Sequence, residues 1–213
     1  WLSVVGWIMF GKVGGEIALH RYLSHRSFET SYWKSRMLIV LSIFNCFGSP
    51  IAWCGVHRKH HAVPETVEDP HGGQSAWRIW TTFWEPFTVE RKFVKDLIKD
   101  NWIKFIHQHY LKILLVSYGV IALVDWRIAV FLISIPAVVT FHSAGAVNVL
   151  CHKWGYRLFN TPDRSTNNTW VNLITLGSGL HNTHHQKPQS WTNKEKWWEI
   201  DLPAWIIKNF LKV

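Results

Sequence analysis

Two long apolar runs dominate the hydropathy pattern of this 213-residue chain. Residues 128–151 contain no Lys, Arg, Asp or Glu, and residues 113–124 are also uncharged and can be extended toward the N-terminus through Lys112. The run 128–151 is long enough to cross a hydrocarbon core of roughly 30 Å as a helix, and the other run reaches that length when it is extended back to residue 105. Residues 125–127 (Asp-Trp-Arg) lie between the runs and are typical of a tight polar turn with an interfacial aromatic ring. The pattern therefore predicts a transmembrane hairpin over residues 105–151.

Two further apolar runs lie nearer the N-terminus. Residues 1–19 are apolar except for Lys12 and Glu16, and they predict the last part of another membrane span. The apolar run within residues 33–53 has only about two-thirds of the length that a span needs. Histidines lie on both sides of it and can meet at one site only if the chain returns to the same side of the membrane. We therefore expect a re-entrant or interfacial helix over residues 33–53 that ends near residues 48–50 (Gly-Ser-Pro).

The remaining segments are more polar. Residues 64–104 have mixed charge and Pro and Gly punctuation, and end in a predicted helical stretch from about residue 89. Residues 152–213 are amphipathic, and the aromatic residues between 197 and 210 predict a helix on the membrane surface or against the domain. The prediction is a single all-α domain over residues 1–213, made of membrane-embedded hairpins with a cytoplasmic helical cap. Because the chain starts at Trp1 and its first hairpin is incomplete, we expect an N-terminal truncation.

Composition supports a membrane location. The chain has 15 tryptophans, many of them at the ends of apolar runs, and amphipathic indole rings favour membrane interfaces. Its formal net charge of +9 suits anionic lipid headgroups or an acidic substrate. The cationic residues are dispersed rather than gathered in one stripe, so no nucleic-acid partner is expected. The three cysteines form no CxxC pair and are expected to be free thiols in a reducing compartment.

Histidines carry the strongest chemical signal. The chain has 13 of them, and eight fall into three short groups: His20 and His25; His57, His60 and His61; His181, His184 and His185. On a helix, positions i, i+3 and i+4 stay within an arc of about 100°, so each HxxHH group is expected to aim three imidazoles at one point. An i, i+5 pair is about 140° apart on an ideal helix, so His20 and His25 are expected to straddle a helix end. More than four nitrogen ligands exceed a tetrahedral zinc site and predict two metals.

At these motifs the chain resembles the integral-membrane fatty-acid desaturases, in particular their acyl-CoA Δ9 (stearoyl-CoA-like) branch. Residues 20–28 (HRYLSHRSF) resemble the family's first histidine box, and residues 53–61 (WCGVHRKHH), followed by 65–71 (ETVEDPH), resemble the second. Residues 148–157 (NVLCHKWGYR) are similar to the family's NSxxHxxGYR segment, and residues 179–185 (GLHNTHH) to its last box. The resemblance covers nearly the whole chain.

The resemblance implies a set of site residues. It adds a ninth metal ligand, so that the set becomes His20, His25, His57, His60, His61, His152, His181, His184 and His185. It also implies that Asn148 holds a metal-bound water. Trp53, one turn before His57, is a candidate wall of the substrate tunnel, with simple interfacial packing as its alternative. His71 follows the DPH motif and is a candidate hydrogen-bond partner of the site. The chain departs from the family at Gly55-Val56, where the acyl-CoA enzymes usually carry Arg-Asp.

Removing hydrogen from an unactivated methylene requires a redox metal. The resemblance implies two Fe ions, O2 as co-substrate, and a cis double bond, Δ9 in position, in an acyl chain. The carrier is left open among coenzyme A, acyl carrier protein and a lipid, and the electron donor between a cytochrome b5 type and a ferredoxin type. The implied location is the membrane, among membrane lipids, with the active site on the cytoplasmic face. Two alternatives remain: a histidine-box hydroxylase or ketolase acting on alkyl or sterol-like lipids, and a metal-binding membrane protein without chemistry, such as a transporter.

Overall fold

The computed structural model describes residues 1–71 and 89–213, and within these ranges the regular elements are all helical. They are α1 (Leu2–Gly6), η1 (Trp7–Ser24), α2 (Tyr32–Ile43), α3 (Pro50–Ala62), η3 (Arg91–Phe93), η4 (Leu97–Lys99), α5 (Asn101–Ile128), η5 (Ala129–Ser134), α6 (Ile135–Leu150), α7 (Thr169–Thr175), α8 (His181–Gln186), α9 (Leu202–Ile206) and η6 (Ile207–Leu211). Elements η1, η5 and η6 are π-helical, whereas η3 and η4 are short 3₁₀ turns. The predicted all-α fold is confirmed.

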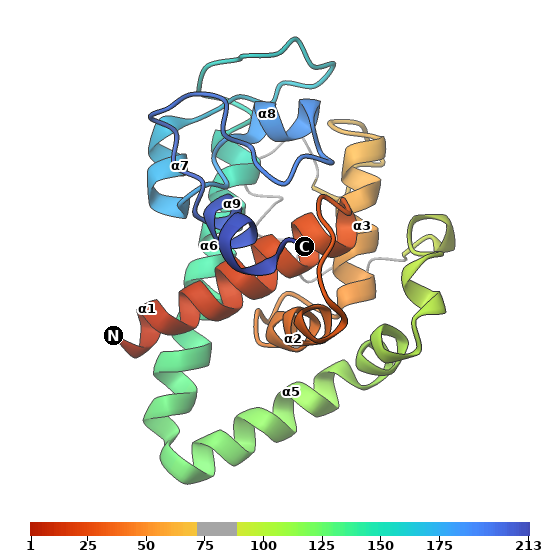
Figure 1. Cartoon of the computed structure of the whole chain (residues 1–213), viewed down its shortest axis with the longest axis vertical. Coiled ribbons are helices and arrows are strands. Elements are labelled where there is room, and N and C mark those ends of the chain that lie inside the picture. Colours follow the sequence, from red (N-terminus) through yellow and green to blue (C-terminus); the bar gives the residue numbers. More distant parts are fainter. Residues whose placement is uncertain (72–88) are drawn as a thin grey trace.

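The first long helix joins α1 and η1 without a break and runs from Leu2 to Ser24. It extends five residues beyond the expected end at residue 19 and crosses α6 near the middle of the molecule (Figure 1). It is long and apolar enough to cross a membrane. Close packing explains its small residues: a Cβ on Gly14 would lie 2.6 Å from the Leu41 backbone oxygen of α2. The helix is therefore central to the fold as well as a candidate span.

The predicted hairpin is formed by α5, η5 and α6, which meet at the end of the molecule farthest from α7 and α8 (Figure 1). Asp100 starts α5 by accepting hydrogen bonds from the backbone N–H groups of residues 102 and 103. The turn lies where the sequence predicts it, because Asp125 leaves the helical conformation with φ −158° and ψ 111°. Large apolar side chains such as Leu115 and Leu123 point outward, as lipid-facing residues do.

Residues 33–53 form two helices with a break between them instead of one. Helix α2 ends at Ile43, and α3 begins at Pro50, where Ser49 Oγ accepts a hydrogen bond from the backbone N–H of Ala52 at 3.3 Å. The Ser-Pro pair thus starts a helix, with a side-chain cap followed by the preset φ of proline. Between the helices, Cys46 and Gly48 have positive φ angles of 61° and 98°. The second histidine group consequently lies at the end of a helix of its own.

Around the histidines, the cap consists of short helices and loops. Helix α8 carries the last histidine group, and its backbone is fixed by Asn167, which accepts from the Thr183 N–H and donates to the Thr183 hydroxyl. The C-terminal helix α9–η6 lies across η1 and buries Ile207 and Leu211 against it. This helix begins at Leu202, so the exposed Trp197 and Trp198 precede it. The stretch 89–104, predicted as helical, contains η3, η4 and only the first turn of α5.

Candidate metal centre

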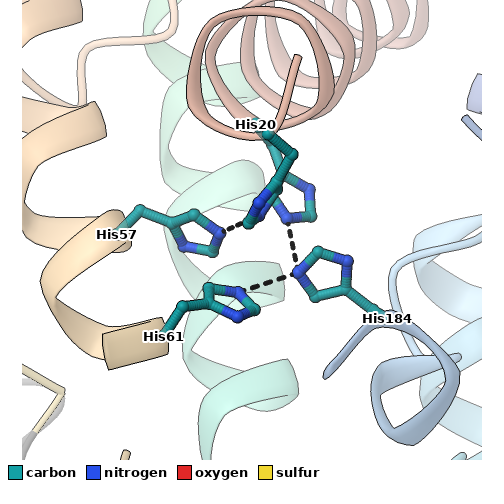
Figure 2. Close-up of side chains that lie close together, drawn as sticks. His20, His57, His61 and His184 are labelled. Carbon is teal, nitrogen blue, oxygen red and sulfur yellow. Dashed lines mark hydrogen bonds between the residues drawn. The ribbon is translucent and has the colours of Figure 1, made fainter. Parts of the chain in front are cut away.

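The structure brings all nine sequence-predicted ligands together in two adjacent groups. Within each group, the potential ligand atoms all lie within 4.8 Å of one another. The five-histidine group consists of His20, His25, His57, His61 and His184, and the four-histidine group of His60, His152, His181 and His185. Figure 2 shows the imidazoles of His20, His61 and His184 pointing toward one another from three separate elements. Segments far apart in the sequence are therefore needed to build either group.

Each HxxHH motif is divided between the two groups, contrary to the expectation that its three imidazoles share one point. On α3, His57 and His61 face the five-histidine group, whereas His60 belongs to the four-histidine group. On α8, His184 faces the former, whereas His181 and His185 face the latter. The difference of about 100° between successive positions is what separates neighbouring rings. Each motif thus contributes rings to both histidine groups.

The winding of η1 explains how His20 and His25 reach the same group. The backbone N–H of His25 donates to the carbonyl of His20 at 3.1 Å, an i to i+5 hydrogen bond that belongs to a π-helix. This pattern brings residue i+5 near residue i along the helix surface, whereas an ideal α-helix separates them by about 140°. The pair does lie at a helix end, as predicted, and the π-winding is the part that the sequence did not indicate.

Four of the histidines each donate an Nδ1–H hydrogen bond to a carboxylate oxygen at 2.9 Å. The pairs are His20 with Glu16, His60 with Asp69, His152 with Glu65 and His185 with Asp163. Burial alone raises the pKa of Asp69, but the hydrogen bond and charge of His60 outweigh it and lower that pKa to about 2. Burial also raises the pKa of Asp163, but its hydrogen bond with His185 outweighs this effect and holds the pKa well below its usual range. Ionised carboxylates at Nδ1 fix these rings with the Nε2 lone pair free for a metal.

The inner nitrogens of the rings fit a pair of metal ions. Four Nε2–Nε2 contacts of 2.8–3.0 Å join His20 to His184, His25 to His57, His61 to His184 and His152 to His181. Among the described residues, His60 Nε2 and His185 Nε2 are buried without any hydrogen-bond partner. Convergent lone pairs repel one another unless a cation lies between them, and buried nitrogens without partners are costly.

The protonation state of the rings also favours metal binding. Burial first, and then the neighbouring imidazoles, lower the pKa well below its ordinary value in four of the nine: His57, His61, His181 and His184. These rings are therefore neutral at pH 7, as metal coordination requires. The donor set consists of imidazoles alone, with carboxylates behind them, and is suited to iron, zinc or copper.

A cavity of about 530 Å³ adjoins the histidines and extends between η1, α5 and α6. Trp53 lines it, with its ring stacked on His57 at a centroid distance of 4.9 Å. Asn148 also lines it. Among the described residues no hydrogen bond to the Asn148 side chain is formed, so the amide does not cap α6. Both residues thus lie on the wall of a largely apolar cavity that reaches His20, His57, His181 and His184.

Several functional residues were not identified from the sequence. Glu16 precedes His20 by four positions on a helix, a spacing that indicates contact, but Asp163 lies in a loop with no such signal. Arg58 binds the backbone oxygens of residues 23 and 24 and pairs with Asp96, which connects α3 to the end of η1. His71, expected as a hydrogen-bond partner of the site, packs its ring against His60 at 4.7 Å.

Comparisons with known proteins agree with this geometry. A family model described as fatty acid desaturase matches residues 1–211. The chain belongs to the fatty acid desaturase family. An sn-1 stearoyl-lipid 9-desaturase of Anabaena variabilis is 33% identical over 97% of this chain and 78% of its own length. An sn-2 palmitoyl-lipid 9-desaturase of Nostoc sp. (strain 36) is 31% identical, with 94% and 74% covered. An acyl-CoA C20 Delta5-desaturase of Anemone leveillei is 30% identical, with 98% and 69% covered.

Membership of the family confirms the predicted enzyme class. This desaturase is an oxidoreductase that introduces a double bond into acyl chains, and the two histidine groups are compatible with its metal site. The relatives act on lipid-linked and on CoA-linked chains according to their names, so the acyl-CoA branch is not singled out. The family is membrane-associated, in keeping with the two helical stretches Leu2–Ser24 and Asn101–Leu150 that are long and apolar enough to span.

Proposed function

We propose that this protein is an O2-dependent di-iron desaturase that forms a cis Δ9 double bond in a lipid-linked acyl chain. The observation that carries the proposal is the pair of all-histidine groups at one end of an apolar cavity. The nine histidines would hold two irons, which when bound supply the O2 chemistry that breaks unactivated C–H bonds. The balanced reaction takes one acyl chain, O2, two electrons and two protons, and gives the unsaturated chain and two water molecules.

The chain's own residues have three tasks in this reaction. The histidines hold the metals, with Glu16, Glu65, Asp69 and Asp163 keeping four of the rings in the required tautomer. The cavity excludes water and holds the acyl chain so that one pair of methylenes lies beside the metals. Trp53 forms the wall next to His57, and Asn148 offers a side-chain amide that would hold a water near His152. Electrons would come from a cytochrome b5-like or ferredoxin-like donor.

A lipid carrier is favoured over coenzyme A by the packing at Gly55. A Cβ atom there would lie 2.2 Å from Val89 Cγ1, so the position has no room for the arginine that acyl-CoA enzymes usually carry. The two cyanobacterial relatives are both named as lipid 9-desaturases, which supports the carrier and the Δ9 position together. Near the carrier end of the bound acyl chain, the protein therefore lacks one cationic side chain that could contact coenzyme A.

Charge asymmetry supports a cytoplasmic active site. The histidine side of the two candidate spans carries several cationic residues, whereas the tip of the hairpin carries Asp125 and Arg127 paired with each other. Arg26 directly follows His25, and Arg58 and Lys59 lie within the second histidine motif. Short segments rich in Lys and Arg remain in the cytoplasm. The two irons, O2 and the donor would accordingly meet on that face.

The test is expression in a host unable to make unsaturated fatty acids, followed by analysis of each lipid class. We expect cis-9 monounsaturated chains esterified in glycerolipids, with metal analysis giving two irons per active chain. A double bond at another position would correct the Δ9 assignment alone. Hydroxylated chains without double bonds would show that the enzyme hydroxylates its substrate and does not desaturate it. Accumulation of unsaturated acyl-CoA before any lipid product would contradict the proposal of a lipid carrier.

A further inference from the structure

A second cavity lies where the first turn of α3 meets η3, η4 and the start of α5. It has a volume of about 770 Å³ and shares no lining residue with the cavity that reaches the histidines. Its polar lining is fully made of exposed side chains: Arg91, Lys95, Lys99, Lys104, His107 and Gln108. Among the described residues no acidic side chain lines it. We call this cavity the basic groove.

The lysines and the arginine of the basic groove form no ion pair in the part of the chain that the structure describes. The carboxylates nearest to them along the chain are already paired with other cations: Asp96 with Arg26 and Arg58, Asp100 with Arg36, and Glu90 with Lys59 and Lys92. Like charges that line one groove repel one another, and an anion bound among them removes this repulsion. The charges of the groove therefore favour a ligand that is negatively charged.

The basic groove lies at one end of a candidate membrane span. Helix α5 begins the span Asn101–Leu150, and its first residues lie away from the hairpin turn (Figure 1). The segment before α5 is tied to the second histidine motif, because Arg58 pairs with Asp96. Trp102 and Phe105 are exposed beside the groove, as aromatic side chains at a membrane interface are. The groove is therefore at the level of the lipid headgroups, on the side of the histidines.

One face of α5 leads from the basic groove into the apolar part of the span. Lys104, Gln108, Leu111 and Leu115 are spaced by four, three and four residues, which places them along one stripe of the helix. The two leucines are 66% and 67% exposed. A phospholipid has the same order of groups, with a charged headgroup at the interface and apolar chains below it. A soluble anion would use the charges and leave the leucines uncovered.

We propose that the basic groove binds the phosphodiester headgroup of an anionic phospholipid whose acyl chains lie along Leu111 and Leu115. Lysine and arginine side chains bind phosphate oxygens, and Gln108 adds neutral N–H donors. The ring of His107 is kept at the groove by its hydrogen bond with the Ser49 hydroxyl, at 2.5 Å. This lipid is a ligand on the outer surface of α5 and is not the chain that is desaturated. Its binding would hold the start of α5 at the headgroup layer.

Equilibrium binding of two radiolabelled lipids tests the proposal on the full-length protein with its metals, in a neutral detergent. The lipids are phosphatidylglycerol and phosphatidylcholine with identical oleoyl chains, so that they differ in the headgroup and its net charge. We expect phosphatidylglycerol to bind about tenfold more tightly at low salt, and this ratio to fall as salt is added. Lys99→Gln and Lys104→Gln in one variant should bring the ratio of the two dissociation constants close to one.

The matched control combines Lys92→Gln with Lys196→Gln, which removes the same net charge from exposed lysines outside the basic groove. It should keep the tenfold ratio. Equal binding of the two lipids by the native protein would overturn the proposal, and so would a preference that survives the loss of Lys99 and Lys104.

Competition distinguishes a lipid from other anions. Unlabelled phosphatidylglycerol should displace the labelled lipid, whereas inorganic phosphate and coenzyme A at the same concentration should not. Displacement by either soluble compound as effective as that by the lipid would show that the groove binds a free phosphate group. Equal binding of the two lipids, together with lysine-dependent binding of an acidic protein, would assign the groove to a protein partner and overturn the proposal.

Discussion

The two histidine groups are built in different ways. In the four-histidine group, three of the four rings have a carboxylate at Nδ1, namely His60, His152 and His185. In the five-histidine group, His20 is the only ring with such a partner among the residues that the structure describes. The other rings of that group are held by packing, as shown by His57, which is stacked on Trp53 and in edge contact with His25 and His61.

The difference follows from the elements that supply the ligands. The five-histidine group draws on the ends of η1, α3 and α8, where helices packed together already fix the side chains. The four-histidine group also depends on residue 152, directly after α6, and on carboxylates from loops around residues 65, 69 and 163. Rings at such places have more rotational freedom, and a charged hydrogen-bond partner removes it. The surplus of two carboxylates also makes the second group the more attractive for a cation.

The largest effect is expected from removing one ligand of each group. His60→Ala should empty the four-histidine group and His184→Ala the five-histidine group, because each loses a ring that no neighbour replaces. Both variants should lose desaturation completely and contain about one metal per chain. Metal analysis of purified protein and lipid analysis of the expressing cells check this, with membrane insertion as the control. Full activity with one metal would refute a two-metal centre.

Asn148 lies one turn before His152 and tests whether the four-histidine group needs an additional amide. Asn148→Ala should keep both metals and the fold but lose most desaturation, because the amide that holds a water at the centre is gone. If Asn148 takes no part in the site, the change would leave turnover near normal. Turnover per folded molecule, measured together with metal content, distinguishes the two, and near-normal turnover at full occupancy removes Asn148 from the site.

Replacing the carboxylate beside one histidine group at a time tests how strongly each group depends on its carboxylates. Asp163→Asn should weaken metal binding about 10- to 100-fold at the four-histidine group only, and Glu16→Gln should do so at the five-histidine group only. Chelator-driven release, followed by metal analysis over time, should therefore show one faster and one unchanged phase in each variant. Both phases changing equally in either variant would mean that the two groups bind metal as a single unit.

The smallest effect is expected at Asp96, which supports both groups equally through Arg58 on α3. Burial raises the pKa of Asp96, but its hydrogen bonds and charge pairing with Arg58 and Arg26 outweigh this and hold it at about 2. Because the folded-state pKa is lower than the unfolded value of about 3.9, this stabilisation is complete above about pH 4 and is lost as the pH falls toward 2.

The Asp96 pair is partly exposed, so Asp96→Asn should cost at most about 1 kcal/mol at pH 7. The native protein and the variant should approach equal stability near pH 2. Denaturation monitored at several pH values measures this, with retention of both metal release phases as the control. A cost that stays constant between pH 7 and pH 2 would show that the charge of Asp96 is not what stabilises α3.

The sequence by itself determined the elements with a strong local signal. The hairpin and its turn at Asp125 follow from continuous apolar runs broken by residues 125–127. Eight of the nine candidate ligands follow from short histidine motifs, and His152 follows from the family resemblance. The prediction of a single helix over residues 33–53 was wrong, because two helices form there. A proline such as Pro50 can end one helix or start the next, and only the packing of α2 and α3 decides between these roles.

Only the tertiary structure decided how the nine histidines are divided between the two groups. Spacing shows that His57, His60 and His61 lie near one face of a helix, but the division between groups depends on where η1, α6 and α8 approach it. The same holds for Asp163, which lies in a loop without periodicity, and for Lys12, whose position in a cavity requires α6 and residue 178 beside η1. Local patterns determine which side chains share a surface, whereas long-range packing determines what that surface faces.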